Sequence, residues 1–274
     1  MRPSRAGCDT YRVTDDRAPT PRPSYAEATD HGLAQLVPDR GGRPGWTLLV
    51  DGVAQSHVRL DDARRLEFAY MRQLASVVDA VADAHDVLHL GAGAMTMPRY
   101  VAATRSGVKQ LVVERDSGLI DLVRRHLPWS TDAGITVMVA DARDAVEALL
   151  DDAYDLIVAD VYQAAQMPGR VASVEFARTI RRVLRETGRY VTNVVDLPGL
   201  TLSRVQAATL RAVFVDVALI ADAGMLRGRR YGNVVLSAGS SPLPRLRVER
   251  GQRVLDGAAL EEFVSGTGPL TETG

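Results

Sequence analysis

Four strand-like apolar runs between residues 85 and 160 each end in a glycine turn or an acidic residue. The runs cover residues 86–90, 110–113, 135–140 and 154–159, and they end in Gly91-Ala92-Gly93, Glu114, Asp141 and Asp160. Apolar runs of this length are typical of parallel strands that are buried on both faces. In open α/β sheets, ligands bind outside the carboxyl ends of such strands. The pattern therefore predicts an α/β fold with a ligand site at one edge of the sheet.

Helical patterns alternate with these strands. Apolar residues recur at helical spacing in segments 67–81, 97–103, 118–126, 142–150, 174–184 and 202–213. Such alternation indicates βαβ units and a mostly parallel sheet. A fifth strand at 189–195 is followed by strands at 217–221 and 231–238, joined by a tight loop without a helix. This late hairpin predicts an antiparallel strand at the sheet edge.

The remaining segments predict a division of the chain into four parts. Residues 1–24 carry four prolines and few apolar residues, which is typical of a disordered leader. Strand candidates at 32–37, 46–50 and 54–60 predict a small β-hairpin or meander domain over residues 25–66. So small a sheet is unstable alone, so we expect it to dock on the main domain or on a second subunit. Residues 67–240 then form the main α/β domain, which the resemblance described below makes Rossmann-like, and residues 241–274 form a tail with one short helix near 260–264.

Composition narrows the class of protein. The chain has 33 basic and 34 acidic residues, so it has no basic field for nucleic acid. No apolar run approaches the roughly 20 residues of a membrane-spanning helix. There is also no hydrophobic segment of a signal peptide, so we expect a cytoplasmic protein. The single cysteine, Cys8, excludes an intrachain disulfide, and the five scattered histidines predict no metal site.

The glycine turn and the acid that follows it predict a nucleoside site. Gly91 and Gly93 allow close backbone approach to a ligand, although a tight strand–helix turn without a ligand has the same pattern. Glu114 lies at the next strand tip, where a carboxylate accepts hydrogen bonds from both ribose hydroxyls. The alternative for Glu114 is a solvated charge. Thr96 stands where a dinucleotide fingerprint has its third glycine, which favours a single nucleoside over NAD.

Two further strand-tip acids each have a ligand interpretation and a structural one. Asp141, with Ala142 beside it, can accept a hydrogen bond from an adenine amino group, or it can cap the following helix. Asp160 follows a buried run and precedes no helical pattern. An acid in a partly desolvated cleft has a raised pKa and can act as a general base. The alternative for Asp160 is a structural loop acid.

The chain resembles the spermidine synthase (polyamine aminopropyltransferase) family in the order and spacing of six segments. These are residues 48–55 (LLVDGVAQ), 88–93 (LHLGAG), 113–116 (VERD), 139–142 (VADA), 154–160 (YDLIVAD) and Glu175-Phe176, within about residues 46–238. The resemblance implies a small β domain before a methyltransferase-like Rossmann domain, and a homodimer. It also implies decarboxylated S-adenosylmethionine as the donor co-substrate, an amine as the acceptor, and no permanently bound cofactor.

The resemblance also implies roles for individual residues. Gln55 is similar to the family's substrate-site glutamine, Glu114 to its ribose-binding acid and Asp141 to the residue beside adenine. Asp160 resembles the aspartate that accepts the proton of the attacking amine. By the same resemblance, Glu67, Tyr162 and Gln163 belong to the acceptor site.

Three positions depart from the family pattern. Ala94 and Gln163 replace aspartates that bind the donor's ammonium group and the amine, and Arg65-Leu66 stand where a tyrosine precedes the helix-opening acid, Glu67. Loss of two carboxylates weakens the attraction for a multiply charged cation. Three functions therefore stay open. They are aminopropyl transfer with Asp160 as proton acceptor, which is the leading expectation, methyl transfer from S-adenosylmethionine, and nucleoside binding without catalysis.

Residues 1–24 are predicted to be dispensable, because they cannot bury enough apolar surface to offset the entropy cost of ordering. A chain shortened to begin at Tyr25 should keep the melting temperature of the full chain in differential scanning calorimetry. A drop of several degrees would show that the leader packs on the core.

Overall fold

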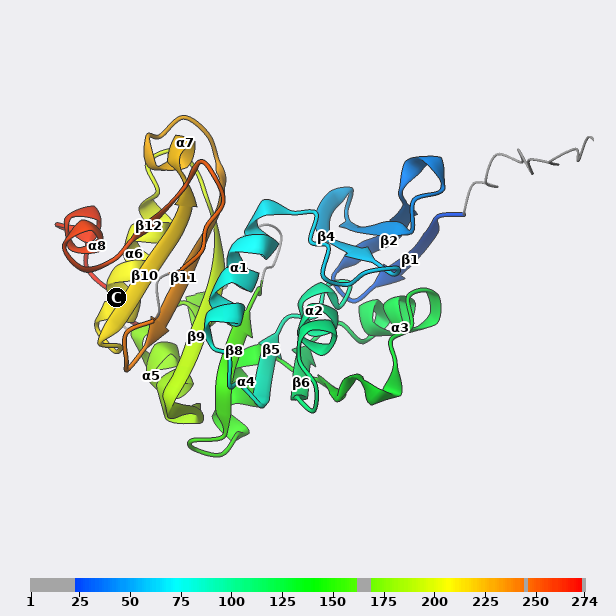
Figure 1. The fold of residues 1–274 in the computed structure, drawn as a ribbon, viewed down its shortest axis with the longest axis horizontal. Coiled ribbons are helices and arrows are strands. Elements are labelled where there is room, and N and C mark those ends of the chain that lie inside the picture. The colour runs from blue at the N-terminus through cyan, green and yellow to red at the C-terminus, as the bar shows by residue number, and fades with distance from the viewer. Residues whose placement is uncertain (1–22, 162–168, 244–245, 273–274) are drawn as a thin grey trace, which may run out of the picture.

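Two β-sheets make up the framework of the computed structural model, which describes residues 23–161, 169–243 and 246–272 (Figure 1). A four-stranded sheet has the order β1-β2-β3-β4, and an eight-stranded sheet has the order β12-β10-β11-β9-β8-β5-β6-β7. The fold class predicted from the sequence, a mostly parallel α/β sheet with a small β domain before it, is confirmed. The predicted leader lies outside the described residues, apart from residues 23 and 24.

The small sheet is an antiparallel meander. Its strands are β1 (Tyr25–Thr29), β2 (Gly32–Pro38), β3 (Gly45–Val50) and β4 (Val53–Arg59). The last three strands correspond to those predicted from the sequence, whereas β1 was not predicted. The sheet lies against the main domain: the Tyr25 ring stacks on His126 with 3.6 Å between the ring centroids, and Arg125 pairs with Glu27 at 2.6 Å. Of the two docking surfaces expected for it, the main domain is therefore confirmed.

Five strands of the large sheet run parallel, as predicted. They are β5 (Asp86–Leu90), β6 (Lys109–Glu114), β7 (Ile135–Val139), β8 (Tyr154–Ala159) and β9 (Leu184–Asp196). Six helices accompany them: α1 (Ala69–Ala80), α2 (Thr96–Thr104), α3 (Ser117–His126), α4 (Ala142–Ala148), α5 (Val174–Val183) and α6 (Thr201–Arg211). Each predicted helical segment therefore corresponds to one observed helix.

The far end of the sheet differs from the prediction. The elements there are β10 (Asp216–Asp222), α7 (Ala223–Leu226), β11 (Gly232–Gly239), β12 (Gln252–Leu255) and α8 (Gly257–Val264). The antiparallel strand β11 lies inside the sheet, between β9 and β10, so its predicted place at the edge is wrong. Six of its eight residues are buried, which suits an inner strand. The edge is formed by β12, in the segment expected to be a tail, and the loop expected to lack a helix contains α7.

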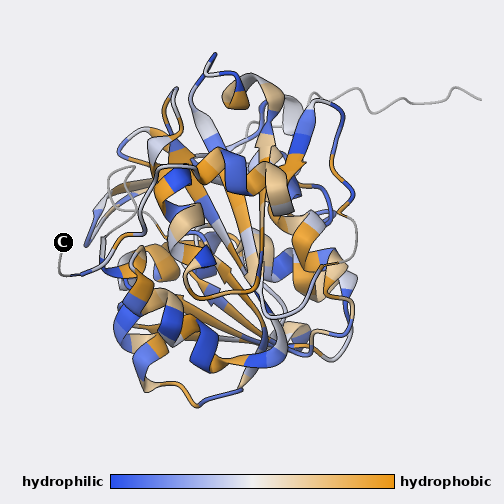
Figure 2. Ribbon diagram, turned by 90° about the vertical axis from the view of Figure 1, so that its left-hand side faces the viewer, coloured by the Kyte–Doolittle hydropathy of each residue, from blue (hydrophilic) through white to orange (hydrophobic). Residues whose placement is uncertain are grey.

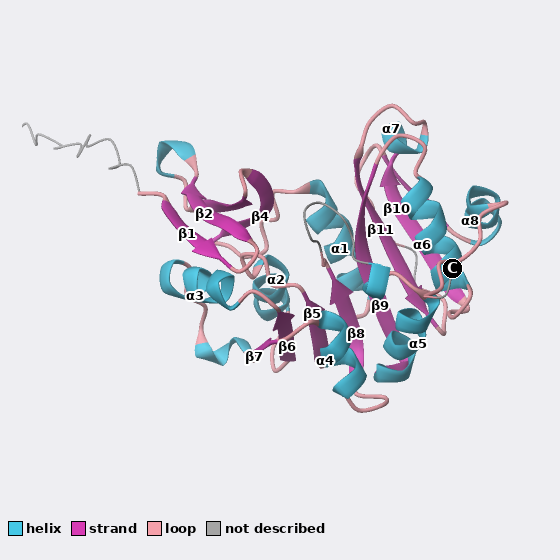
Figure 3. Ribbon diagram, turned by 180° about the vertical axis from the view of Figure 1, so that it is seen from behind, coloured by secondary structure: helices cyan, strands magenta, loops and turns pink. Residues whose placement is uncertain are grey.

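Alternating side chains of the parallel strands pack on opposite faces of the sheet. Leu88, Leu90 and Ile157 belong to the apolar cluster under α4, α5 and α6, whereas Val87 and Leu156 belong to the cluster under α1 and α2. Figure 3 shows α4, α5 and α6 on the face opposite to α1. Apolar residues follow the strands through the interior (Figure 2). A sheet covered in this way leaves its strand ends as the accessible edge, which positions a site there.

The tips of β5 and β8 approach each other closely at Gly91. Gly91 has φ +89°, and a Cβ atom at this position would lie 2.4 Å from the carbonyl oxygen of Asp160. Backbone hydrogen bonds of 2.9 Å join the Asp160 N–H to Leu90 and the Gly91 N–H to Val113. Only glycine combines this dihedral angle with this approach. The glycine turn therefore sets where Asp160 lies.

Gly91→Ala should lower the free energy of unfolding by about 2–4 kcal/mol, because it adds an atomic overlap to the strain of a positive φ. Gly107→Ala is the matched control, since Gly107 has φ +72° and no atom near its Cβ position. The control should lose only about 1–2 kcal/mol. Equal losses in urea denaturation would mean that the close approach to Asp160 contributes nothing.

Candidate active site

Asp160 follows β8 and is held by hydrogen bonds from two other elements. The Tyr70 hydroxyl, on α1, donates to Oδ2 at 3.2 Å, and the Asn193 amide, on β9, donates to Oδ1 at 2.8 Å. Asn233 on β11 donates to Oδ1 of Asn193 at 3.0 Å, so the amide NH₂ of Asn193 faces the carboxylate. The carboxylate is therefore fixed in one orientation.

Burial raises the pKa of Asp160 above its ordinary value. The hydrogen bonds from Asn193 and Tyr70 lower this pKa, but desolvation is the larger effect. Part of the residue remains accessible to solvent. A carboxylate in this state binds a proton more tightly than an ordinary aspartate, which is a property of a general base.

Tyr70 and Asn193 are site residues that the analysis of the sequence missed. The tyrosine expected before Glu67 is absent there, but Tyr70 in the first turn of α1 places a phenol on Asp160. The same hydroxyl lies 3.1 Å from the backbone carbonyl of Gln55, which brings the predicted residue Gln55 to the site. The available signal for Asn193 was an amide side chain among the β-branched residues Val191, Thr192, Val194 and Val195, and it is 2% exposed.

Glu114 lies at the glycine turn, as its place at the tip of the next strand predicts. Its Oε2 accepts the Ala92 N–H at 2.9 Å, and its Oε1 accepts the N–H groups of Arg115 at 2.9 Å and Asp116 at 3.0 Å. The carboxylate therefore shapes the turn. This structural function leaves the predicted ribose contact as a hypothesis.

The small β sheet contacts the main domain just beyond the glycine turn. The Ser56 and Thr96 hydroxyls are 2.8 Å apart, and Thr96 donates to the His57 carbonyl at 3.0 Å. A Cβ atom on Gly93, which has φ +49°, would lie 3.2 Å from the Ser56 side chain. Glycine at this position lets β4 approach the turn, so the small sheet lies directly against this edge of the large sheet.

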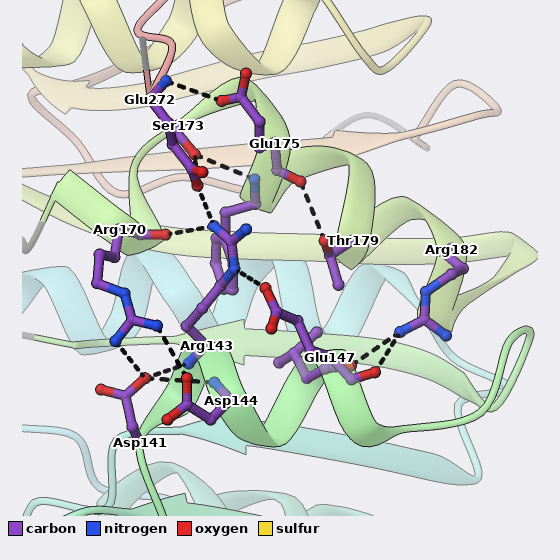
Figure 4. Close-up of polar contacts among 12 residues, drawn as sticks. Asp141, Arg143, Asp144, Glu147, Arg170, Ser173, Glu175, Thr179, Arg182 and Glu272 are labelled. Carbon is purple, nitrogen blue, oxygen red and sulfur yellow. Dashed lines mark hydrogen bonds and ion pairs between the residues drawn. The ribbon is translucent and has the colours of Figure 1, made fainter.

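Asp141 caps the N-terminus of α4. This is the structural alternative that the sequence predicted for it. Its Oδ1 accepts the N–H of Arg143 at 2.9 Å and that of Asp144 at 3.4 Å. The Arg170 guanidinium lies 3.9 Å from the same oxygen, and Figure 4 shows these residues grouped in front of α4. The Ala142 side chain is buried in the core. The adenine contact predicted for Asp141 and Ala142 remains a hypothesis.

Residues 270–272 contact the starts of α4 and α5. Glu272 pairs with Arg143 at 2.5 Å, accepts the Ser173 hydroxyl at 3.1 Å and donates its backbone N–H to Glu175 at 3.1 Å (Figure 4). The Leu270 carbonyl accepts the Val174 N–H at 2.8 Å. Residues 270–272 thus pack on α4 and α5.

Of the three predicted substrate residues, Glu67 lies in the described part of the chain, and Tyr162 and Gln163 lie outside it. Glu67 is exposed and lines a cavity whose lining does not include Asp160. Ala94 is fully buried in the apolar cluster beneath the small sheet. Over residues 23–161, 169–243 and 246–272, no group of three His, Cys, Asp or Glu side chains could hold a metal ion. In the same ranges no helix is long and apolar enough to cross a membrane.

Comparison with known proteins connects this geometry to one family. No family model matches the chain. Polyamine aminopropyltransferase 1 of Pseudomonas aeruginosa is 30% identical over 196 residues, covering 69% of this chain and 65% of that protein. Polyamine aminopropyltransferase of Aeropyrum pernix is 27% identical over 165 residues, covering 57% and 51%. The chain thus aligns with about half to two thirds of these curated relatives.

A solved structure extends the similarity to almost the whole chain. The crystal structure of a probable spermidine synthase from Corynebacterium glutamicum matches with a TM-score of 0.85 and 30% sequence identity. The match covers 90% of this chain and 96% of that one. The chain belongs to the spermidine synthase (polyamine aminopropyltransferase) family, as a divergent member.

Proposed function

We propose that the protein transfers an aminopropyl group from decarboxylated S-adenosylmethionine to an amine acceptor, with Asp160 as the proton acceptor. The observation that carries the proposal is the environment of Asp160, whose pKa is raised by burial. The relatives named polyamine aminopropyltransferase support the class of reaction. A homodimer, expected from the resemblance, belongs to the same proposal.

The residues at the strand tips suit an adenosyl donor. Glu114 at the glycine turn would accept hydrogen bonds from the ribose, and Asp141 at the tip of β7 would lie beside the adenine. Gln55 would contribute from the small sheet, where its carbonyl already contacts the Tyr70 hydroxyl. Gly91 and Gly93 allow the backbone to approach the ligand. These groups hold and orient the donor, which is the main requirement when its leaving group is already activated.

The reaction forms one bond and breaks one. The amine nitrogen attacks the carbon next to the sulfonium, a C–N bond forms, and the C–S bond breaks with its electron pair going to sulfur. Methylthioadenosine leaves as a neutral thioether. The proton on the nitrogen passes to the Asp160 carboxylate, whose raised pKa makes it a stronger base than an ordinary aspartate. Tyr70 and Asn193 keep this carboxylate in place.

Methyl transfer from S-adenosylmethionine is the second candidate, and Ala94 is the observation that favours it. This position carries no carboxylate for the donor's ammonium group, and its side chain is buried in apolar surroundings. A donor that keeps its methionine carboxylate would need such an aspartate less. The same nucleoside residues would serve both donors, so the released product distinguishes the two reactions.

Asp160→Asn should abolish transfer while preserving the fold. General-base catalysis contributes about 10²- to 10⁴-fold, so release of methylthioadenosine from decarboxylated S-adenosylmethionine with an amine should fall by that factor. The affinity for methylthioadenosine should stay nearly unchanged. Asp83→Asn, at an exposed aspartate, is the matched control and should keep full activity. Full activity in Asp160→Asn would exclude Asp160 as the proton acceptor.

The raised pKa also predicts how stability depends on pH. The stabilising contribution of Asp160 is fully present below its unfolded-state pKa and is lost as pH rises through the higher folded-state pKa. Asp160→Asn should therefore be at least as stable as wild type at pH 7. The asparagine introduced at position 160 can also satisfy its hydrogen bonds. Its amide oxygen accepts from Asn193, and its amide NH₂ donates to the Tyr70 oxygen. The Tyr70 hydroxyl then donates to the Gln55 carbonyl.

Melting curves between pH 4 and pH 8 measure this difference. Any advantage of Asp160→Asn over wild type should shrink as the pH falls toward 4. A variant that melts several degrees below wild type at pH 7 would contradict the proposed desolvation of the carboxylate.

Glu114→Ala should weaken methylthioadenosine binding about 10- to 100-fold, the usual effect of losing a charged hydrogen bond. Free adenine, which lacks the ribose, should bind the variant as it binds wild type. Isothermal titration calorimetry well below the melting temperature compares the two ligands, with exposed Glu186→Ala as the control. Equal weakening for both ligands would mean that Glu114 acts only by shaping the turn.

A further inference from the structure

A cavity of about 610 Å³ lies where β4 leads into α1. Five arginines line it, Arg43, Arg59, Arg64, Arg65 and Arg72, and Glu67 is the one carboxylate in the lining. Arginine is common throughout this chain, so single arginines carry little weight. Five guanidinium groups around one cavity carry more weight than single arginines. Positive charges this close together repel one another, and an anion between them relieves that repulsion.

Two of the arginines have carboxylate partners outside the lining. Arg59 forms a bidentate pair with Asp61 at 2.9 and 2.7 Å. Arg72 pairs with Glu249 at 2.7 Å and donates to the Leu66 carbonyl at 2.8 Å. These contacts hold both side chains in place at the cavity wall, and they leave little of their charge for a ligand.

Arg64 and Arg65 keep their charge available. Arg64 donates through Nε and Nη2 to the Ala103 carbonyl at 3.1 and 2.8 Å, so it is anchored by a neutral partner. Arg65 is exposed and its side chain makes no hydrogen bond or ion pair within the described parts of the chain. A guanidinium presents several N–H donors in a planar fork that matches carboxylate and phosphate.

The start of α1 adds a second favourable field for an anion. The helix has 12 residues, its N-cap is Phe68 without a side-chain cap, and its first turn contains no acidic residue. Leu66 and Glu67, which line the cavity, directly precede this N-cap residue. The unpaired N–H groups and the positive end of the helix dipole at this place favour negative charge.

One lining residue of the cavity, Glu67, is close in the chain to a residue of the candidate active site. Tyr70, whose hydroxyl contacts Asp160, follows Glu67 by three residues. Their Cα atoms are therefore at most about 11 Å apart. We infer that the cavity binds an acidic group. Building on the proposed function, we assign it to the acceptor, which is then an amine that carries a carboxylate or phosphate and not a plain polyamine.

Two amines that differ by one carboxylate test this assignment. Ornithine is 1,4-diaminobutane with an added carboxylate, and isothermal titration calorimetry in the presence of methylthioadenosine measures both. Wild type should bind ornithine at least tenfold more tightly. Arg64→Gln/Arg65→Gln should lose roughly tenfold or more in ornithine affinity. Its affinity for the diamine should be unchanged or higher.

Two further variants keep the test interpretable. Arg65→Gln alone changes an exposed side chain, so it should fold normally and lose part of the ornithine affinity. Arg229→Gln changes an exposed arginine away from the cavity and should have no effect. Equal affinity of wild type for the two amines, or equal loss of both in the double variant, would overturn the inference.

Transfer assays separate this inference from the proposed function. If neither amine accepts an aminopropyl group but the calorimetric pattern holds, the proposed function is wrong and the acidic-group site stands. If 1,4-diaminobutane is the better acceptor and the double variant leaves its turnover unchanged, the function stands and the inference is wrong. Binding of inorganic phosphate that the double variant loses, with ornithine affinity unaffected, would overturn the assignment to the acceptor.

Discussion

The close approach of the Gly91 turn to the backbone of Asp160 determines where the other groups of the site can lie. It brings the tip of β5 against the residue that follows β8, and Gly91 allows it because no Cβ atom intervenes. Glu114 then closes the same turn from β6 through the Ala92 N–H. Asp160 and Glu114 both contact this turn through its backbone. A ligand at this edge would therefore meet the glycine turn and the two acids together.

The Asp160 carboxylate also depends on elements that are far apart in the sequence. Tyr70 comes from α1, Asn193 from β9, and Asn233 supports Asn193 from β11. The strand order explains this gathering, because β11 inserts beside β9 and not at the edge of the sheet. The small sheet joins through the Gln55 carbonyl. An acid that is desolvated and held by neutral donors keeps a raised pKa without an ion pair, which suits a group that must gain and release a proton.

The sequence predicted the parts of the fold that depend on local patterns. Strand tips, helices and the positions of Gly91, Glu114, Asp141 and Asp160 follow from periodicity, because each strand and its end are contiguous in the chain. Strand order beyond β9 could not be predicted, since it depends on which apolar strand fills the place beside β9. Tyr70 and Asn193 were missed for a related reason: their importance comes from contacts across elements, and neither stands in a recognisable motif. The arginine cavity likewise needs residues from the turn before β3, the end of β4 and the start of α1.

The central claim is that an adenosyl sulfonium donor gives its aminopropyl group to an amine at Asp160. The most direct test gives the full-length protein equal amounts of S-adenosylmethionine and its decarboxylated form, with ornithine and 1,4-diaminobutane as acceptors. Mass spectrometry then identifies the adenosyl product. The account predicts methylthioadenosine together with an aminopropylated amine. S-adenosylhomocysteine would contradict it in favour of methyl transfer, and the absence of both products would contradict it in favour of nucleoside binding without catalysis.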